Sequence, residues 1–305
     1  MMRLQVLLII FVSFILASCD KPTDINSKKK IVCFVSILPQ SYFVKKIGGD
    51  FVDVKVLVGP GQSPATYEPT QKQLTLLSKA SCFFTIGVPF EKSFIPRLSR
   101  IYKMPIIKTH SGIKLRNLQN HHHDHDHHHH HDGGKDPHIW LDPLLVKKQA
   151  QKIADSLSDL LPQQKDYFAQ NLIIFNEDLS LLDKKIKQLF KETSQKIMWV
   201  YHPSYGYFCD RYGLEQMAIE TEGKSPGAKH LAKLISRAKQ QNIRAIFVQK
   251  QFMGKSPNAI LLALEEYYKS QKRVSLCKTI TLDPLAYNYA ENLLSMASNI
   301  AEYLK

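Results

Sequence analysis

Residues 162–192 read PQQKDYFAQNLIIFNEDLSLLDKKIKQLFKE, and this stretch decides the fold. The spacing of its apolar residues alternates between four and three, as expected for one face of a helix over about three heptads. The residues on this face are Phe168, Leu172, Phe175, Leu179, Leu182, Ile186 and Leu189. Pro162 suits the first position of a helix, and a helix from there to about Glu192 would be roughly 45 Å long.

The apolar face of this helix has two possible partners. In a coiled-coil dimer it would pack against the same helix of a second chain, because a dimer seam uses the same heptad spacing. In a single chain it would be a rigid strut that packs against neighbouring structure. We favour the strut, and therefore a monomer, because strand and helix patterns flank the stretch on both sides. A second helical stripe, between Val146 and Leu161, directly precedes it.

Runs rich in β-branched and aromatic residues flank the long helix on both sides. Those of strand length are Ile31–Ser36, Phe51–Val58 and Cys82–Ile86, then Ile197–Tyr201, Gln216–Ile219, Ile243–Val248 and Val274–Cys277. Helical stretches are expected at about 228–240, 256–271 and 284–304. Because strand and helix signals alternate, the sequence predicts an α/β fold with two lobes, each a mainly parallel sheet flanked by helices. The N-terminal lobe would span 31–161, the backbone helix 162–193 and the C-terminal lobe 194–305.

Composition excludes several classes of protein. The chain has 305 residues with a formal net charge of +14, and 44% of them are hydrophobic, which excludes a chain disordered throughout. A basic chain could bind nucleic acid, but its lysines are scattered and no recognition motif is present, so we expect no such partner. Five cysteines do not make a disulfide scaffold. We expect Cys33, Cys82, Cys209 and Cys277 to be buried small hydrophobes, and the sequence assigns no disulfide among them.

The N-terminal stretch indicates export. Residues 1–18 read MMRLQVLLIIFVSFILAS, a positive residue followed by an apolar run typical of a signal peptide. Cys19 follows Leu-Ala-Ser, which resembles the lipobox whose cysteine receives a lipid. The alternative is an ordinary signal peptide with a chance cysteine. With a polar tether at 19–30, we expect a protein anchored by lipid on Cys19 at the periplasmic or cell-surface face of the cytoplasmic membrane.

Histidine is the most unevenly distributed residue. Nine of the 13 fall in NHHHDHDHHHHHD (120–132), inside a stretch, 118–135, that we expect to be a disordered loop. Neutral imidazole binds Zn²⁺ well, but a flexible run cannot fix one geometry. We interpret the tract as auxiliary metal capture, and a solvated polar insert is the alternative. Its histidines are His121, His122, His123, His125, His127, His128, His129, His130 and His131.

An ordered metal site must come from residues outside the tract. His138 lies in DPHIWLDP (136–143), a segment stiffened by two Asp-Pro pairs. His202 follows the expected strand that ends at Tyr201, and Asp283 lies near the end of the last strand signal. Ligands gather at the C-terminal ends of parallel strands. The three residues, His138, His202 and Asp283, would therefore close a site in the cleft between the lobes.

Five stretches resemble one protein family. They are GPGQSPATYEPT (59–70), DPHIWLDP (136–143), YHPSYGYFCDRYGL (201–214), EGKSPGAKHL (222–231) and LDPLAYNY (282–289). The chain resembles the solute-binding proteins that deliver zinc or manganese to ABC transporters, most closely the zinc-binding branch. The resemblance implies two α/β lobes bridged by a long helix, metal ligands at the positions of His138, His202 and Asp283, and a membrane permease with its ATPase as partners. Imidazole favours zinc as the cargo, because Mn²⁺ sites contain more carboxylates.

One position departs from the family pattern. A histidine usually precedes the segment that matches Thr66–Pro69, whereas this chain has Ala65. Three ligands leave one position of a tetrahedral Zn²⁺ open. Water or a histidine of the tract could fill it, and Glu68 or His110 could also reach it.

Three other functions are compatible with parts of the sequence. A zinc hydrolase also has three protein ligands and an open position, but the sequence contains no HExxH or GxSxG motif, so we expect no enzyme. A manganese-binding homologue of the same type remains an alternative. An adhesin-like or metal-storing surface lipoprotein is the third.

Overall fold

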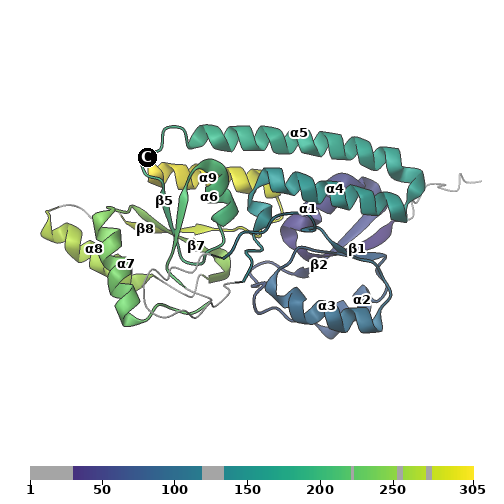
Figure 1. Ribbon diagram of the computed structural model, residues 1–305, viewed down its shortest axis with the longest axis horizontal. Helices are drawn as coiled ribbons and strands as arrows, with labels where there is room; N and C mark the ends of the chain where they lie inside the picture. The colour runs from purple at the N-terminus through teal and green to yellow at the C-terminus, as the bar shows by residue number, and fades with distance from the viewer. Residues whose placement is uncertain (1–29, 119–133, 221–222, 253–256, 273–276) are drawn as a thin grey trace, which may run out of the picture.

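The computed structural model describes residues 30–118, 134–220, 223–252, 257–272 and 277–305. These residues form two lobes side by side, with a long helix running along both (Figure 1). The N-terminal lobe contains β1 (Ile31–Ile37), α1 (Leu38–Gly48), β2 (Val52–Val58), α2 (Gln71–Leu77), β3 (Cys82–Thr85), α3 (Pro89–Ile101) and β4 (Ile106–Lys108). The connection consists of η2 (Ile139–Leu141), α4 (Pro143–Leu160) and α5 (Lys165–Leu189). The C-terminal lobe contains β5 (Ile197–Val200), α6 (Gly206–Tyr212), β6 (Glu215–Ala218), α7 (Ala228–Gln240), β7 (Ala245–Gln249), η4 (Lys250–Phe252), α8 (Asn258–Ser270), β8 (Lys278–Leu282) and α9 (Tyr289–Leu304).

Each lobe is built on a parallel sheet. The strand order is β2-β1-β3-β4 in the first lobe and β6-β5-β7-β8 in the second, and every pairing is parallel. The predicted α/β fold with two mainly parallel sheets is therefore confirmed. In both sheets the first strand of the lobe lies inside, between the second and third, so the connections leave a crevice at the C-terminal strand ends.

Helix α5 is the strut that the heptad pattern predicted. Its buried residues are Phe168, Leu172, Phe175, Leu179, Leu182 and Ile186, all members of the predicted face. The helix packs against α1 and α4 on one side of the molecule and against α9 on the other. It is shorter than the expected 162–193, because Pro162–Gln164 form a 3₁₀ turn and Phe190 already leaves the helix. Its 25 residues span ~37 Å.

Three elements differ from the sequence-based expectation. Strand β4 was not predicted, because it has only three residues. The last strand is Lys278–Leu282 rather than Val274–Cys277 (273–276 lie outside the described residues). This edge strand is mostly exposed and lacks the apolar run on which the prediction relied. Helix α9 begins at Tyr289, because a loop separates it from Asp283.

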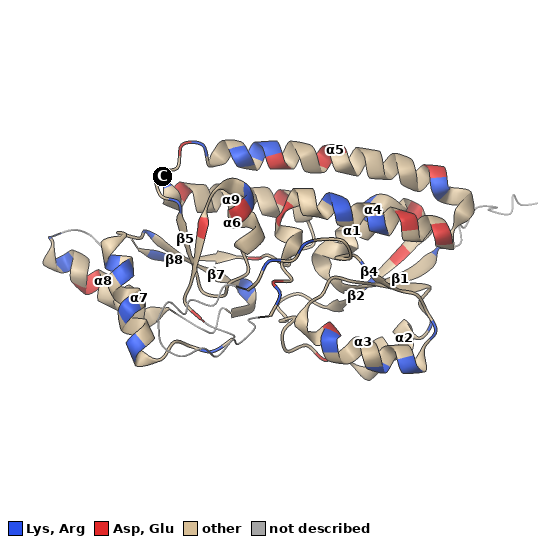
Figure 2. Cartoon of the chain, in the orientation of Figure 1, with Lys and Arg blue, Asp and Glu red and all other residues tan. Residues whose placement is uncertain are grey.

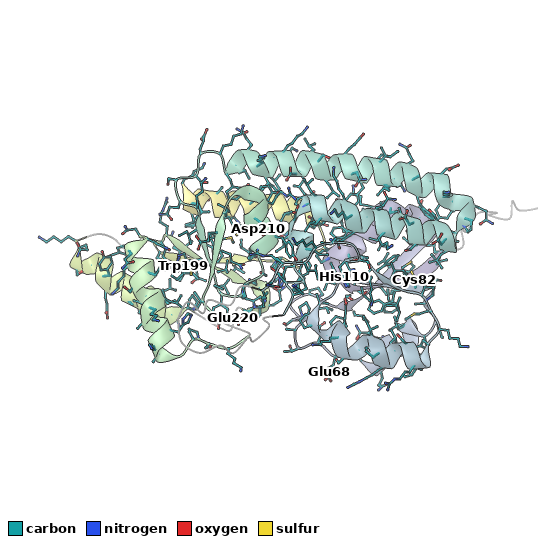
Figure 3. The ribbon with its side chains drawn as sticks, in the orientation of Figure 1. Glu68, Cys82, His110, Trp199, Asp210 and Glu220 are labelled. Carbon is teal, nitrogen blue, oxygen red and sulfur yellow. The ribbon has the colours of Figure 1, made fainter. Side chains whose placement is uncertain are left out.

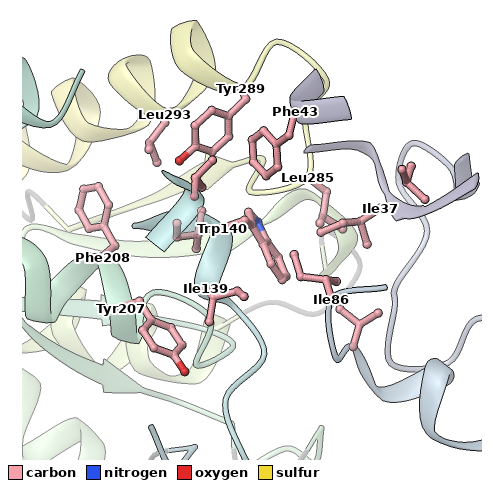
Figure 4. Packing of buried hydrophobic residues seen from close by; sticks show 14 of the residues in the cluster. Ile37, Phe43, Ile86, Ile139, Trp140, Tyr207, Phe208, Leu285, Tyr289 and Leu293 are labelled. Atoms are coloured by element: carbon pink, nitrogen blue, oxygen red, sulfur yellow. The ribbon is translucent and has the colours of Figure 1, made fainter. Parts of the chain in front are cut away.

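The lobes share one apolar core. Phe43 of α1 and Tyr289 of α9 meet edge to face, with ring centroids 4.9 Å apart. Trp140 lies near Ile86 of the first lobe and Leu285 of the second (Figure 4). Its indole N–H donates to the carbonyl of Pro284, at 2.8 Å. These contacts fix the two lobes against each other at the level of the 3₁₀ turn η2.

The outer surface carries the charge. Lys and Arg are spread over the exposed faces of several helices, with Asp and Glu among them (Figure 2). Cys33, Cys82 and Cys209 are buried thiols, as expected, and Cys277 is partly buried. Among the described residues, no helix combines the length and apolar character needed to cross a membrane.

Candidate metal centre

A cavity of about 220 Å³ lies where the two lobes meet. His138 and His202 both line it, and their ring centroids are 5.6 Å apart. The rest of the lining is mainly apolar, with a few amide and hydroxyl groups. It includes Ser63, Pro64, Ala65, Val88, Pro89, Leu118, Gly134, Lys135, Pro137, Trp140, Ser204, Gln249, Gln251, Phe252, Pro284 and Leu285. The structure thus brings together two of the three ligands predicted from the sequence.

His138 is held by the residue two positions before it. Asp136 is buried, and its Oδ1 accepts both from the backbone N–H of His138, at 3.0 Å, and from Nδ1 of the ring, at 2.7 Å. A carboxylate only accepts hydrogen bonds, so Nδ1 carries the proton. The other ring nitrogen, Nε2, therefore has the free lone pair that a metal ion requires.

His202 is held in the same way by a different element. It lies two residues beyond β5, and its Nδ1 hydrogen-bonds to Oε1 of Glu220, two residues beyond the neighbouring β6. Its backbone N–H donates to Gln249, which donates back to the carbonyl of His202 at 2.6 Å. The ring of Phe252 stacks on its imidazole at 4.8 Å. His202 therefore also has its Nδ1 protonated and its orientation fixed.

The protonation state of His202 suits metal binding. Burial lowers the pKa of His202, while the hydrogen bond that its Nδ1–H donates to Glu220 opposes the shift. The imidazole is therefore neutral at pH 7, as a metal ligand must be. Neutral imidazole held through Nδ1 by a carboxylate is a recurrent arrangement around protein-bound zinc.

Asp283 lies beside the cavity, with its carboxylate engaged elsewhere. It directly follows β8 (Lys278–Leu282), whereas it was expected near the end of a strand at Val274–Cys277. Its Oδ1 accepts from the backbone N–H of Leu285, at 3.1 Å, and from Nε2 of Gln251, at 3.2 Å. Its Oδ2 lies 3.6 Å from Nζ of Lys250. Pro284 and Leu285 line the cavity but Asp283 does not, so its carboxylate would have to turn to share a metal ion with the two imidazoles.

Two of the candidates for a fourth ligand, Glu68 and His110, do not line the cavity. Ala65 lines the cavity together with the two predicted ligand histidines. Position 65, where a histidine is expected from the family pattern, therefore lies at the candidate metal site. Glu68 is exposed at the edge of the N-terminal lobe (Figure 3). His110 packs near Gly87, and both burial and Lys108 lower its pKa. In the part of the chain that the structure describes, no group of three or more His, Cys, Asp or Glu side chains could hold a metal ion.

The described residues on either side of the histidine tract line this cavity. The nine tract histidines and Cys19 lie outside the described residues. The residues on either side are joined, since Leu118 N–H donates to the carbonyl of Gly134 at 2.9 Å and Asn117 pairs with Lys135 in an antiparallel bridge. Leu118, Gly134 and Lys135 all line the cavity. The described residues that flank positions 119–133 therefore meet in the wall of the cavity beside His138.

Sequence reasoning missed the two orienting carboxylates. Asp136 was not among the predicted site residues, although its position two residues before His138 is a signal for an orienting role. Glu220 could have been found from strand pairing, because Val200 lies opposite Ala218 and the same offset places His202 opposite Glu220. That offset is visible only once β5 and β6 are known to be neighbours.

Comparisons with known proteins show the family and the fold of the chain. A crystal structure of ZnuA superposes with a TM-score of 0.79 at 36% identity, covering 91% of this chain and 100% of that one. The high-affinity zinc uptake system protein ZnuA of Bacillus subtilis is 29% identical, over 76% of this chain and 75% of its own length. The zinc-binding lipoprotein AdcA of Streptococcus pneumoniae is 29% identical over 82% of this chain and 51% of its own. A family model described as zinc-uptake complex component A, periplasmic, matches residues 33–304. The chain therefore belongs to the family of periplasmic zinc-uptake component A proteins.

Proposed function

We propose that this protein is the extracytoplasmic zinc-binding component of an ABC transporter, which captures Zn²⁺ and delivers it to a membrane permease. One observation carries the proposal. Two imidazoles from different segments face one cavity between the lobes, and each has its Nδ1 bound to a buried carboxylate. A carboxylate on the Nδ1 of histidine is a recurrent support for histidines that bind a metal ion. The B. subtilis relative and the zinc-bound structure of a ZnuA deletion variant carry zinc in their names.

The donor set favours zinc over manganese. Two imidazole donors suit Zn²⁺, whereas Mn²⁺ sites rely on carboxylate and water oxygens. In this proposal Asp283 turns from Lys250 and Gln251 to become the third ligand. Water or a histidine of the 120–132 tract then completes a tetrahedron, because Ala65 has no donor atom.

The protein binds its cargo without chemical change. A hydrolase would need a general acid or base beside the metal-bound water. Both buried carboxylates at the cavity already serve the histidines, and the nearby amide Gln249 is not a base. The loaded protein is a monomer that docks on a permease, whose ATPase supplies the energy. The lipobox-like Cys19 and the lipoprotein name of the S. pneumoniae relative support a lipid anchor at the outer face of the cytoplasmic membrane.

Metal analysis tests the proposed function. In a variant lacking residues 120–132, the purified protein should bind one Zn²⁺ tightly, measured by competition with a chelator. His138→Ala and His202→Ala should each abolish this tight binding, because either change leaves too few protein donors. Retention of stoichiometric tight binding by both variants would show that the cavity is not the metal site.

A further inference from the structure

The carboxylate that orients His138 has a second partner, Arg116. Oδ1 of Asp136 faces His138, whereas Oδ2 lies 3.9 Å from Nε of Arg116. Asp136 is 1% exposed, so its charge is out of contact with water. A buried carboxylate needs a nearby cation or several donors to stay ionised. Arg116 supplies that cation without competing for the oxygen that the histidine uses.

A backbone and hydroxyl network connects the same two residues to the C-terminal lobe. Asp136 N–H donates to the carbonyl of Arg116, at 3.0 Å. Arg116 N–H donates to the hydroxyl of Tyr207, and this hydroxyl donates to the carbonyl of Asp136, both at 3.0 Å. Burial raises the pKa of Tyr207 to about 12, so the hydroxyl keeps its proton at neutral pH. Tyr207 lies in α6, so a helix of one lobe holds the histidine segment of the cleft.

The first residue of α6 leaves room for the guanidinium. A Cβ at Gly206 would lie 1.8 Å from Nη1 of Arg116 and 2.9 Å from Oδ2 of Asp136. Any side chain at this position would therefore displace the arginine. The guanidinium also lies 5.8 Å from the ring centre of Tyr207, and its Nη1 is 3.5 Å from Oδ2 of Asp210. Shape and charge together place Arg116 behind the carboxylate.

We propose that Arg116 is a positioning residue for zinc capture, which holds Asp136, and through it His138, against helix α6. The inference rests on the proposed function, with His138 as a zinc ligand. Arg116 lines a separate cavity of about 370 Å³ together with Lys114 and Asp210. That cavity leaves space for replacement side chains.

Two substitutions of equal charge test the proposal in the full chain. Arg116→Met should weaken the tightest zinc site by about tenfold, because partners beyond the ligands are worth about 10–100-fold in affinity. Lys114→Met removes one positive charge from the same cavity without touching Asp136 and should leave the affinity unchanged. Arg116→Lys keeps the charge but not the planar fork, so it should restore part of the loss.

A substitution in the other lobe tests the same contact without changing charge. Gly206→Ala should weaken zinc binding as Arg116→Met does. Gly227→Ala is the matched control, because a Cβ there meets nothing within 4 Å. If Gly206 acts through Arg116, the double variant should lose no more than either single one. Thermal unfolding of each variant shows which proteins are folded, and chelator competition on those gives the affinities.

The outcomes separate this proposal from the proposed function. Wild-type affinity in folded Arg116→Met and Gly206→Ala would overturn the role of Arg116, while loss in His138→Ala would leave the function standing. Additive losses in the double variant, or no rescue by Arg116→Lys, would also overturn it, because a general structural effect predicts both. Absence of tight zinc binding in the wild type would instead refute the function.

Discussion

Replacing Glu220 by Gln should weaken zinc binding while leaving the fold intact. Glu220 is 2% exposed, its Oε1 accepts from Nδ1 of His202, and its Oε2 is buried with no hydrogen-bond partner among the described residues. The change conserves shape and removes one charge and one acceptor. It therefore tests the orienting role of the carboxylate directly.

The magnitude follows from the two ways in which the amide can lie. If its oxygen faces His202, the NH₂ group occupies the place of Oε2, where no acceptor is seen, at a cost of about 1–3 kcal/mol. If its NH₂ faces His202, Nδ1 must become the acceptor, and the proton moves to Nε2, where it blocks the metal. We therefore expect a loss of about 10–100-fold in zinc affinity, or about 1.4–2.7 kcal/mol.

Chelator competition gives the affinity, and Glu215→Gln is the matched control. Glu215 is the first residue of β6, the strand that ends two residues before Glu220. Its side chain is 53% exposed and forms an ion pair with Arg237 at the surface. Its replacement should change zinc affinity less than twofold, since exposed ion pairs contribute little. The reasoning is refuted if Glu220→Gln binds zinc as tightly as wild type while His202→Ala does not.

Four further predictions follow from the sequence and the structure. If a tract histidine completes the site, deletion of residues 120–132 should weaken zinc affinity strongly with unchanged circular dichroism, and unchanged tight binding would exclude that ligand. Phe175→Ala should lower the free energy of unfolding in denaturant by about 3–5 kcal/mol, because this side chain is buried. Ile174, which is 48% exposed on the same helix, is the control, and Ile174→Ala should lower it by at most about 0.5 kcal/mol. Equal losses in the two variants would contradict the packing of α5. Burial raises the pKa of Glu91 from 4.5 in the folded protein, so the protonated carboxyl stabilises the fold fully below pH 4.5 and this stabilisation is lost as the pH rises through the folded pKa. The melting temperature of the wild type should therefore fall, relative to that of Glu91→Gln, as the pH rises above 4.5. Melting temperatures that depend on pH in the same way in both proteins would contradict this. Zinc should leave the radius of gyration in X-ray scattering nearly unchanged, because α5 packs against both lobes, and a large change would show that the strut bends.

The fold was predictable where one face of an element is buried. The heptad residues of 162–192 became the buried face of α5, because a long helix between two lobes must cover its apolar stripe. The last strand was misplaced, because β8 lies at a sheet edge and its exposed residues carry no apolar signal. Strand β4 is too short to give a periodic pattern.

The site was predictable only as far as single segments allow. His138 and His202 stand out because each lies in a segment with proline and an adjacent strand or turn. Glu220 and Arg116 act across segments far apart in sequence, so their roles depend on strand pairing and on the contact of α6 with η2. The orientation of the Asp283 carboxylate, turned away from the two imidazoles, depends on its contact with Lys250. The two residues lie far apart in sequence, so local patterns do not encode this contact.

The walls of the cavity are not equally tied to the C-terminal lobe. Tyr207 of α6 donates to the carbonyl of Asp136, and the indole of Trp140 donates to the carbonyl of Pro284, so hydrogen bonds tie the His138 segment to the lobe that contains His202. The wall at 63–65 is anchored differently, since Pro64 accepts from the backbone N–H of Phe90 in the N-terminal lobe. In the family pattern this wall contributes a histidine, and metal binding would then bridge the two lobes. With Ala65 in its place, we expect the remaining ligands to act as one unit, so that zinc is captured and released by side-chain turns at Asp283 rather than by separation of the lobes.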